Sequence, residues 1–184
     1  MVKKYSGVAI TLHWIIALGI IINGSLPWIW EAVSDDNVRP LIDAHKSIGV
    51  TVLGLAVMRL LWRLTHRPPA LPTSYKPWEV KASHVAHWAL YAIIFAMPLT
   101  GWIMDSAWKD AATHPMQWFG LFEWPRIGLV MNLDPATKEA YHDAFGEAHE
   151  LLGWVLYGLF ALHVGAAFKH QWMDGEAELQ RMMP

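Results

Sequence analysis

The chain has 184 residues, of which 54% are hydrophobic and only 16% are charged, whereas soluble domains carry about 25% charged residues. Its formal net charge is -2, so it has no basic footprint of the kind that binds nucleic acid. It contains no cysteine, which excludes disulfides, thiolate metal sites, iron–sulfur clusters and covalent c-type haem attachment. This composition predicts an integral membrane protein.

The first predicted span covers about residues 8–30, and this stretch contains no acidic residue, lysine or arginine. It follows Lys3 and Lys4, as the core of a signal peptide would. However, it is longer than such a core and ends without a small-residue cleavage site. We therefore interpret it as an uncleaved membrane helix, which carries His13 about five residues from its start.

Three further apolar stretches follow, each near the length of about 20 residues that a membrane-spanning helix needs. They cover about residues 45–64, 82–104 and 149–168. The charges in the second stretch lie inside it or at its ends, and the last two contain no charged residue apart from histidines and Glu150. These patterns predict an all-α fold: one transmembrane domain over residues 1–184, built as a four-helix bundle.

The longest segment between spans covers about residues 106–146 and is too rich in tryptophan and phenylalanine for a fully solvated loop. We expect a short interfacial or re-entrant piece there, covering the end of the bundle. Towards its end, Asp134 precedes Pro135, a pattern typical of a helix N-cap followed by proline at the first helical position. The last helix is therefore predicted to begin near Pro135.

The distribution of lysine and arginine predicts the orientation of the bundle in a membrane. Basic residues gather before the first span, between the second and third, and after the fourth, whereas the other two loops are net acidic. We therefore expect both termini in the cytoplasm, the acidic loops in the periplasm, and a multi-pass protein of the bacterial inner membrane.

This topology sorts four histidines into two levels. His13 and His163 lie on the cytoplasmic side, and His45 and His149 on the periplasmic side. His149 and His163 are fourteen residues apart, which places them on one helical face about 21 Å apart. Neutral imidazoles on facing helices can clamp a haem iron, so two levels suggest two haems. Zinc is less consistent with this pattern, because its ligands converge at one point.

Two features leave alternatives open. His84 and His87 lie near the cytoplasmic start of the third span, and their depth alone would allow either to be the inner haem ligand. Arg59 lies towards the cytoplasmic end of the second span. Its side chain can extend to the membrane interface, or it can pair with the propionate groups of a haem.

Several stretches together resemble the small bacterial di-haem cytochrome b561 family over essentially the whole chain. They are Lys4-Tyr5-Ser6, Leu12-His13-Trp14, Arg39-Pro40-Leu41-Ile42, Met58-Arg59-Leu60-Leu61, Ala82-Ser83-His84-Val85-Ala86-His87, Met97-Pro98-Leu99-Thr100-Gly101, Glu147-Ala148-His149-Glu150, Leu162-His163-Val164-Gly165 and Leu179-Gln180-Arg181-Met182-Met183-Pro184. The resemblance implies two non-covalent b haems, with His13, His45, His149 and His163 as their axial iron ligands.

The same resemblance implies an oxidoreductase that passes electrons between a small periplasmic donor and the ubiquinone pool. One branch that the chain resembles oxidises superoxide, which makes superoxide a candidate donor. His87 is then a candidate hydrogen-bonding group for the quinone. The alternative is the cytochrome b membrane anchor of a larger respiratory dehydrogenase or hydrogenase complex, with the tryptophan-rich outer segment as the contact surface.

Overall fold

The computed structural model describes residues 3–183 and contains four helices long and apolar enough to cross a membrane. They are α1 (Gly7–Trp30), α2 (Asp35–Thr65), α3 (Pro77–Ala107) and α5 (Pro135–Phe168), and α5 continues as the π-helical turn η1 (Lys169–Met173). The prediction of an all-α membrane bundle is thereby confirmed. Pro184, the last residue of the tail pattern, lies outside the described residues.

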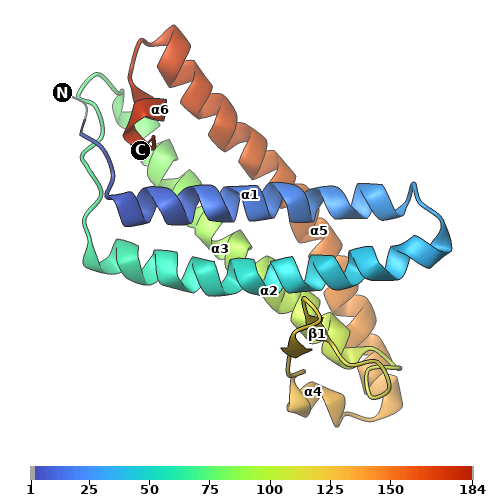
Figure 1. The fold of residues 1–184 in the computed structure, drawn as a ribbon. Coiled ribbons are helices and arrows are strands. Elements are labelled where there is room, and N and C mark those ends of the chain that lie inside the picture. Colours follow the sequence, from blue (N-terminus) through green and yellow to red (C-terminus); the bar gives the residue numbers. More distant parts are fainter. Residues whose placement is uncertain (1–2, 184) are drawn as a thin grey trace.

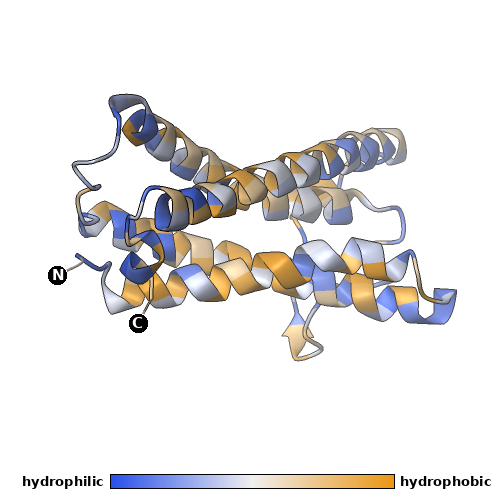
Figure 2. Ribbon diagram, turned by 90° about the horizontal axis from the view of Figure 1, so that it is seen from above, coloured by the Kyte–Doolittle hydropathy of each residue, from blue (hydrophilic) through white to orange (hydrophobic). Residues whose placement is uncertain are grey.

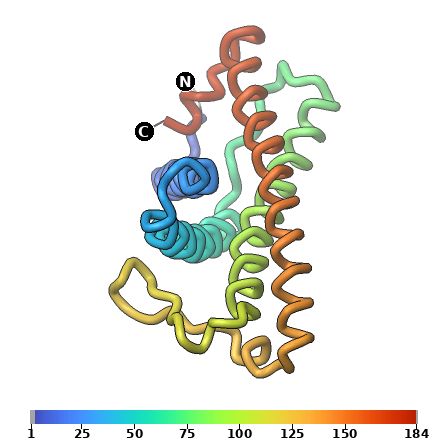
Figure 3. The backbone as a smooth tube through the Cα atoms, turned by 90° about the vertical axis from the view of Figure 1, so that its right-hand side faces the viewer, coloured from blue at the N-terminus to red at the C-terminus, as the bar shows by residue number. Residues whose placement is uncertain are grey.

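The helices form two antiparallel pairs that cross each other (Figure 1). α1 packs along α2, α3 packs along α5, and α2 joins the pairs through its contacts with α3. Seen along the first pair, the α3–α5 pair runs past one side of it (Figure 3). The described ends of the chain lie together at one end of the bundle, which we call the inner end, and Tyr5 N–H donates to the Arg181 carbonyl there at 3.1 Å.

Residues 108–134 lie at the opposite end of the α3–α5 pair and against α2, at what we call the outer end. This outer segment contains a two-stranded antiparallel hairpin, β1 (Gln117–Trp118) and β2 (Phe122–Glu123), and the short helix α4 (Gly128–Met131). Phe119 and Gly120 turn the hairpin with positive φ angles of 48° and 70°. The predicted apolar segment thus folds back against the bundle as a compact cover.

The start of α5 shows how local sequence sets a helix boundary. Asp134 is its N-cap, the Asp134 carboxylate accepts the backbone N–H of Thr137 at 3.1 Å, and Pro135 occupies the first turn. This confirms the predicted cap. Hydrogen bonds from Thr137 hold the pKa of the Asp134 carboxyl below its usual range, because they favour the charged form.

Many large apolar side chains on the four long helices are exposed, and few are buried in a protein core. Leu18, Leu61 and Leu162 are examples, with 58%, 58% and 70% of their surface exposed. Hydrophobic residues dominate the middle of the helices, and hydrophilic residues gather towards their ends (Figure 2). A lipid bilayer is the solvent that suits such a surface.

Candidate functional site

One histidine pair lies towards the outer end, between α2 and α5. The rings of His45 and His149 face each other edge to face, with centroids 6.0 Å apart. Nδ1 of His45 lies 3.2 Å from the Asn23 carbonyl oxygen, and Nδ1 of His149 lies 2.9 Å from that of Met97. If each Nδ1 donates its hydrogen to that carbonyl, each Nε2 keeps a lone pair for a metal, as in other metal-binding histidines.

Three histidines gather towards the inner end. The rings of His13 on α1 and His163 on α5 have centroids 6.1 Å apart, and the ring centroid of His87 on α3 lies 5.5 Å from that of His163. Trp14 packs 5.2 Å from His13 and donates its indole N–H to the Met182 carbonyl at 2.6 Å. The structure therefore brings together the pair expected from depth, and it places His87 beside that pair.

Both pairs have the spacing that a shared metal centre requires. A metal–imidazole nitrogen bond is about 2 Å and each nitrogen lies about 1 Å from its ring centre, so a bis-imidazole clamp separates the centroids by about 6 Å. The observed separations are 6.0 and 6.1 Å. In each pair one ring comes from the α1–α2 hairpin and the other from α5, so the four residues fit two haem irons.

Arg59 has a buried donor that no described group accepts. Its Nε donates to the Tyr91 hydroxyl at 3.2 Å, whereas its Nη1 is buried without a hydrogen-bond partner. The guanidinium is close enough to His13, His87 and His163 to interact with each electrostatically. A guanidinium with an unsatisfied buried N–H next to the inner histidines suits the carboxylate of a haem propionate.

A cavity of about 430 Å³ opens beside the inner histidines. Polar side chains from three parts of the chain line it, namely Tyr5, Arg63, Ser83, His84 and His87. Its other wall is the apolar, proline-rich segment 68–72. The cavity therefore combines an apolar wall with several polar groups, and small-molecule sites use polar groups of this kind to orient a ligand.

The C-terminal segment 174–183 holds that proline-rich wall in place. The buried Arg181 donates from Nη2 to the carbonyls of Pro69 and Ala70 at 3.0 and 2.9 Å. The Tyr75 hydroxyl donates to the Glu178 carboxylate at 2.6 Å. Burial and this hydrogen bond raise the pKa of Tyr75 well above its usual value. Sequence reasoning recognised the tail only as part of a family pattern and did not predict these contacts.

One group of metal-ligating residue types meets at the inner end, where Glu79, His170 and Asp174 lie within 4.8 Å of one another. The Lys169 ammonium already lies 2.7 Å from a carboxylate oxygen of Glu79 and 2.7 Å from one of Asp174. It holds the pKa of the Asp174 carboxyl below its usual range. We therefore interpret this group as an ion-pair network that anchors η1 to the start of α3.

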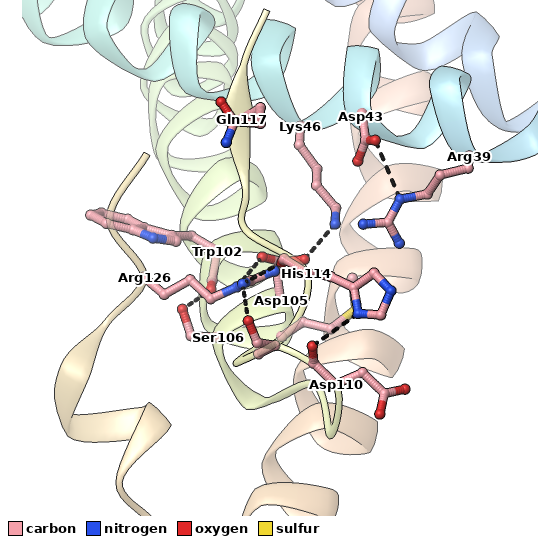
Figure 4. Close-up of polar contacts among 12 residues, drawn as sticks. Arg39, Asp43, Lys46, Trp102, Asp105, Ser106, Asp110, His114, Gln117 and Arg126 are labelled. Carbon is pink, nitrogen blue, oxygen red and sulfur yellow. Dashed lines mark hydrogen bonds and ion pairs between the residues drawn. The ribbon is translucent and has the colours of Figure 1, made fainter. Parts of the chain in front are cut away.

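The outer segment is held to the bundle by polar contacts with α2 and α3. Ser47 accepts the backbone N–H of Phe119 at 3.0 Å, and the Trp118 indole donates to Thr51 at 3.0 Å. At the end of α3, Lys46 and Arg126 approach the buried Asp105 from different sides (Figure 4). None of these charge contacts was predicted, because the partners are far apart in the sequence.

Comparison with known proteins identifies the family. The family model for the prokaryotic cytochrome b561 matches residues 4–184. The chain belongs to this family. It is 30% identical to cytochrome b561 homolog 2 of Escherichia coli (strain K12), over 98% of this chain and 92% of that protein. It is 27% identical to the probable superoxide oxidase CybB of Yersinia pestis, over 100% of this chain and 98% of that protein. It is also 24% identical to the E. coli cytochrome b561 homolog 1, over 99% of this chain and 98% of that protein.

Membership of this family establishes the general role of the protein. It is a bacterial membrane cytochrome that binds haem b and transfers electrons. The resemblance inferred from the sequence is thereby confirmed.

Proposed function

We propose that this cytochrome b561 holds two b haems, one at each level of the bundle, and passes single electrons from a donor on the periplasmic side to the ubiquinone pool. The observation that carries the proposal is the pair of facing histidine couples. His13 with His163 and His45 with His149 have nearly equal ring separations of 6.1 and 6.0 Å.

The residues of this chain account for both binding and placement. A haem held by two histidines supplies reversible one-electron chemistry. Asn23 and Met97 orient the outer imidazoles through their carbonyls, which determines the nitrogen that each ring presents. α5 carries one ligand of each pair, fourteen residues apart, and so sets the two sites about 21 Å apart along one helix.

The inner cavity is the proposed quinone site. His87 and His84 line this cavity. The His87 ring centroid lies 5.5 Å from that of His163, a member of the inner histidine pair. A quinone that accepts two electrons also takes up two protons, and an imidazole is a suitable group to pass them. The proline-rich wall offers an apolar surface to the ring.

Superoxide is the proposed donor, at the outer end. The support is the likeness over the full chain to a relative named a probable superoxide oxidase. The outer end also carries Lys46, which directly follows His45 in α2, and Arg126, although the loops there are net acidic. We place both termini in the cytoplasm, from the distribution of lysine and arginine.

The second candidate is the cytochrome anchor of a larger respiratory complex. The outer segment presents large apolar side chains, with Leu121 73% exposed and Leu129 87% exposed, and these could contact a partner subunit. Mild solubilisation followed by co-purification separates the two. A stoichiometric second subunit supports the anchor role, and an isolated cytochrome that reduces quinone supports the first.

The haem proposal is tested by removing one ligand at a time. Pyridine haemochrome analysis of the wild-type protein is expected to give two haems per chain. His149→Ala is expected to lose or destabilise the outer haem and spare the inner one, and His163→Ala to do the reverse. His66→Ala, away from both pairs, is the matched control. One haem in the wild-type protein, or equal bleaching of both by either variant, contradicts the proposal.

The donor and the quinone site are tested by stopped-flow kinetics. Superoxide is expected to reduce the haems rapidly, and added ubiquinone to reoxidise them. His87→Phe is expected to slow reoxidation and leave reduction unchanged. If superoxide reduces neither haem, the donor is a different one. If reoxidation of His87→Phe equals that of the wild type, the quinone binds elsewhere.

A reporter fused to the C-terminus that is active only in the periplasm contradicts the orientation.

A further inference from the structure

Three charged side chains meet at the outer end within a few ångströms. Lys46 Nζ lies 2.5 Å from one oxygen of Asp105, and Arg126 Nε lies 2.8 Å from the other. Their side chains are 17%, 5% and 7% exposed, in the order Lys46, Asp105, Arg126. Figure 4 shows the three converging between α2, α3 and the outer segment.

The group carries an excess of positive charge. Two cations share one carboxylate, so the sum of formal charges is +1 in a largely buried place. Nη1 of Arg126 donates to the backbone carbonyls of Ala111 and His114, which are neutral. Nη2 of Arg126 is buried without a hydrogen-bond partner among the described residues. Water screens a buried charge poorly, so it acts over a longer distance than an exposed one.

Two members of the triad are linked to the outer histidine pair through the helices that carry them. Lys46 directly follows His45 in α2. Asp105 is one helical turn beyond Gly101, and Gly101 is so close to His149 that a Cβ added there would lie 3.1 Å from the imidazole Cε1. One turn of helix is about 5.4 Å. The triad is therefore built into the surroundings of the outer pair.

We propose that the Lys46–Asp105–Arg126 triad raises the reduction potential of the outer haem, and so positions that site to take electrons from the donor. This inference rests on the two-haem function proposed above. Reduction adds one negative charge at the metal centre, and a fixed positive charge nearby stabilises that form relative to the oxidised one. Lys46, Asp105 and Arg126 act through the field they create and touch no reacting atom, so they are positioning residues.

The same contacts also attach the outer segment to α3, so the experiment must distinguish charge from structure. Opposite changes of charge at two neighbouring residues do this. Lys46→Met keeps an apolar stem of similar length and lowers the sum of charges from +1 to 0. Asp105→Asn keeps the shape of the side chain and raises the sum to +2. Together they restore it to +1, although every ion pair in the triad is then lost.

Spectroscopic redox titration of the purified two-haem protein provides the readout. The component lost in His149→Ala identifies the outer haem. Its midpoint potential is expected to fall in Lys46→Met, rise in Asp105→Asn and return towards the wild-type value in the double variant. The inner haem, about 21 Å away along α5, is expected to shift much less. Lys46→Arg, which keeps the charge, is expected to leave both potentials unchanged.

Arg39→Gln is the matched control. Arg39 pairs with Asp43 on the same helix, and both side chains are more than 40% exposed, so water and salt should screen the change. Shifts of the same sign in Lys46→Met and Asp105→Asn, or a double variant worse than either, overturn the proposal and indicate a structural role. A Lys46→Arg variant that shifts like Lys46→Met overturns it too. Absence of the outer haem from the wild-type protein contradicts the two-haem function instead.

Discussion

Replacing Gly101 by alanine should disturb the outer haem site selectively. Gly101 on α3 lies against the His149 ring, and a Cβ at this position would lie 3.1 Å from Cε1 and 3.3 Å from Nδ1. The ring cannot move away freely, because its Nδ1 lies 2.9 Å from the Met97 carbonyl and 3.1 Å from the Thr100 hydroxyl. The added methyl group must therefore push the imidazole or spread α3 and α5 apart.

The size of the effect follows from the contact distances. Ordinary contact begins at 3.4 Å, so the ring must move by a few tenths of an ångström. Metal–ligand distances tolerate only about 0.2 Å. Overpacking of this kind costs about 1–3 kcal/mol, and a penalty of about 1–3 kcal/mol weakens binding roughly 5- to 150-fold. Alanine also favours a helix over glycine by about 1 kcal/mol, so the apoprotein should remain folded.

The assay is haem loading of purified Gly101→Ala, followed by the optical spectrum and the redox titration of each haem. We expect a loss of outer haem, or a shift of its spectrum, while the inner haem is retained. Gly158→Ala is the matched control, since a Cβ at this position of α5 meets nothing within 4 Å. Equal loss of both haems, or full loading with an unchanged outer spectrum, would refute the reasoning.

Three further predictions concern the parts that support the two ends of the bundle. Ser47→Ala should lower the free energy of unfolding by about 1–3 kcal/mol, because the buried Ser47 hydroxyl accepts the backbone N–H of Phe119. Thermal unfolding measures this loss of stability, and a change below about 0.5 kcal/mol argues against the contact. Asp134→Ala should cost about 0.5–2 kcal/mol and raise hydrogen exchange in the first turn of α5; unchanged exchange there would contradict the cap. The pKa of Asp174 is lowered in the folded chain, so its ion pairs stabilise the fold fully above the ordinary carboxyl pKa and are lost as the pH falls through the lowered value. Proteolysis of the tail should therefore increase as the pH falls through that range, and an Asp174→Asn variant should lose this pH dependence.

The sequence was sufficient for features that depend on nearby residues and on the thickness of a bilayer. The four spans follow from length and hydropathy, and the N-cap at Asp134 follows from two adjacent residues. The sorting of histidines by depth followed from the same reasoning, since a membrane helix places each residue at a depth set by its position along the chain. Depth predicted the neighbours His13 and His163 at the inner level, and His45 and His149 at the outer one.

Rotation about the helix axes and long-range contacts required the tertiary structure. Depth alone did not distinguish the roles of His13 and His87, and the structure places both beside His163. The carbonyls next to the outer rings have no local sequence signal. The same is true of the hydrogen bonds from Arg181 to a loop 111 and 112 residues earlier. The Lys46–Asp105 pair likewise joins residues 59 positions apart. Such pairs form because two helices cross at a particular angle, and no property of either short stretch specifies that angle.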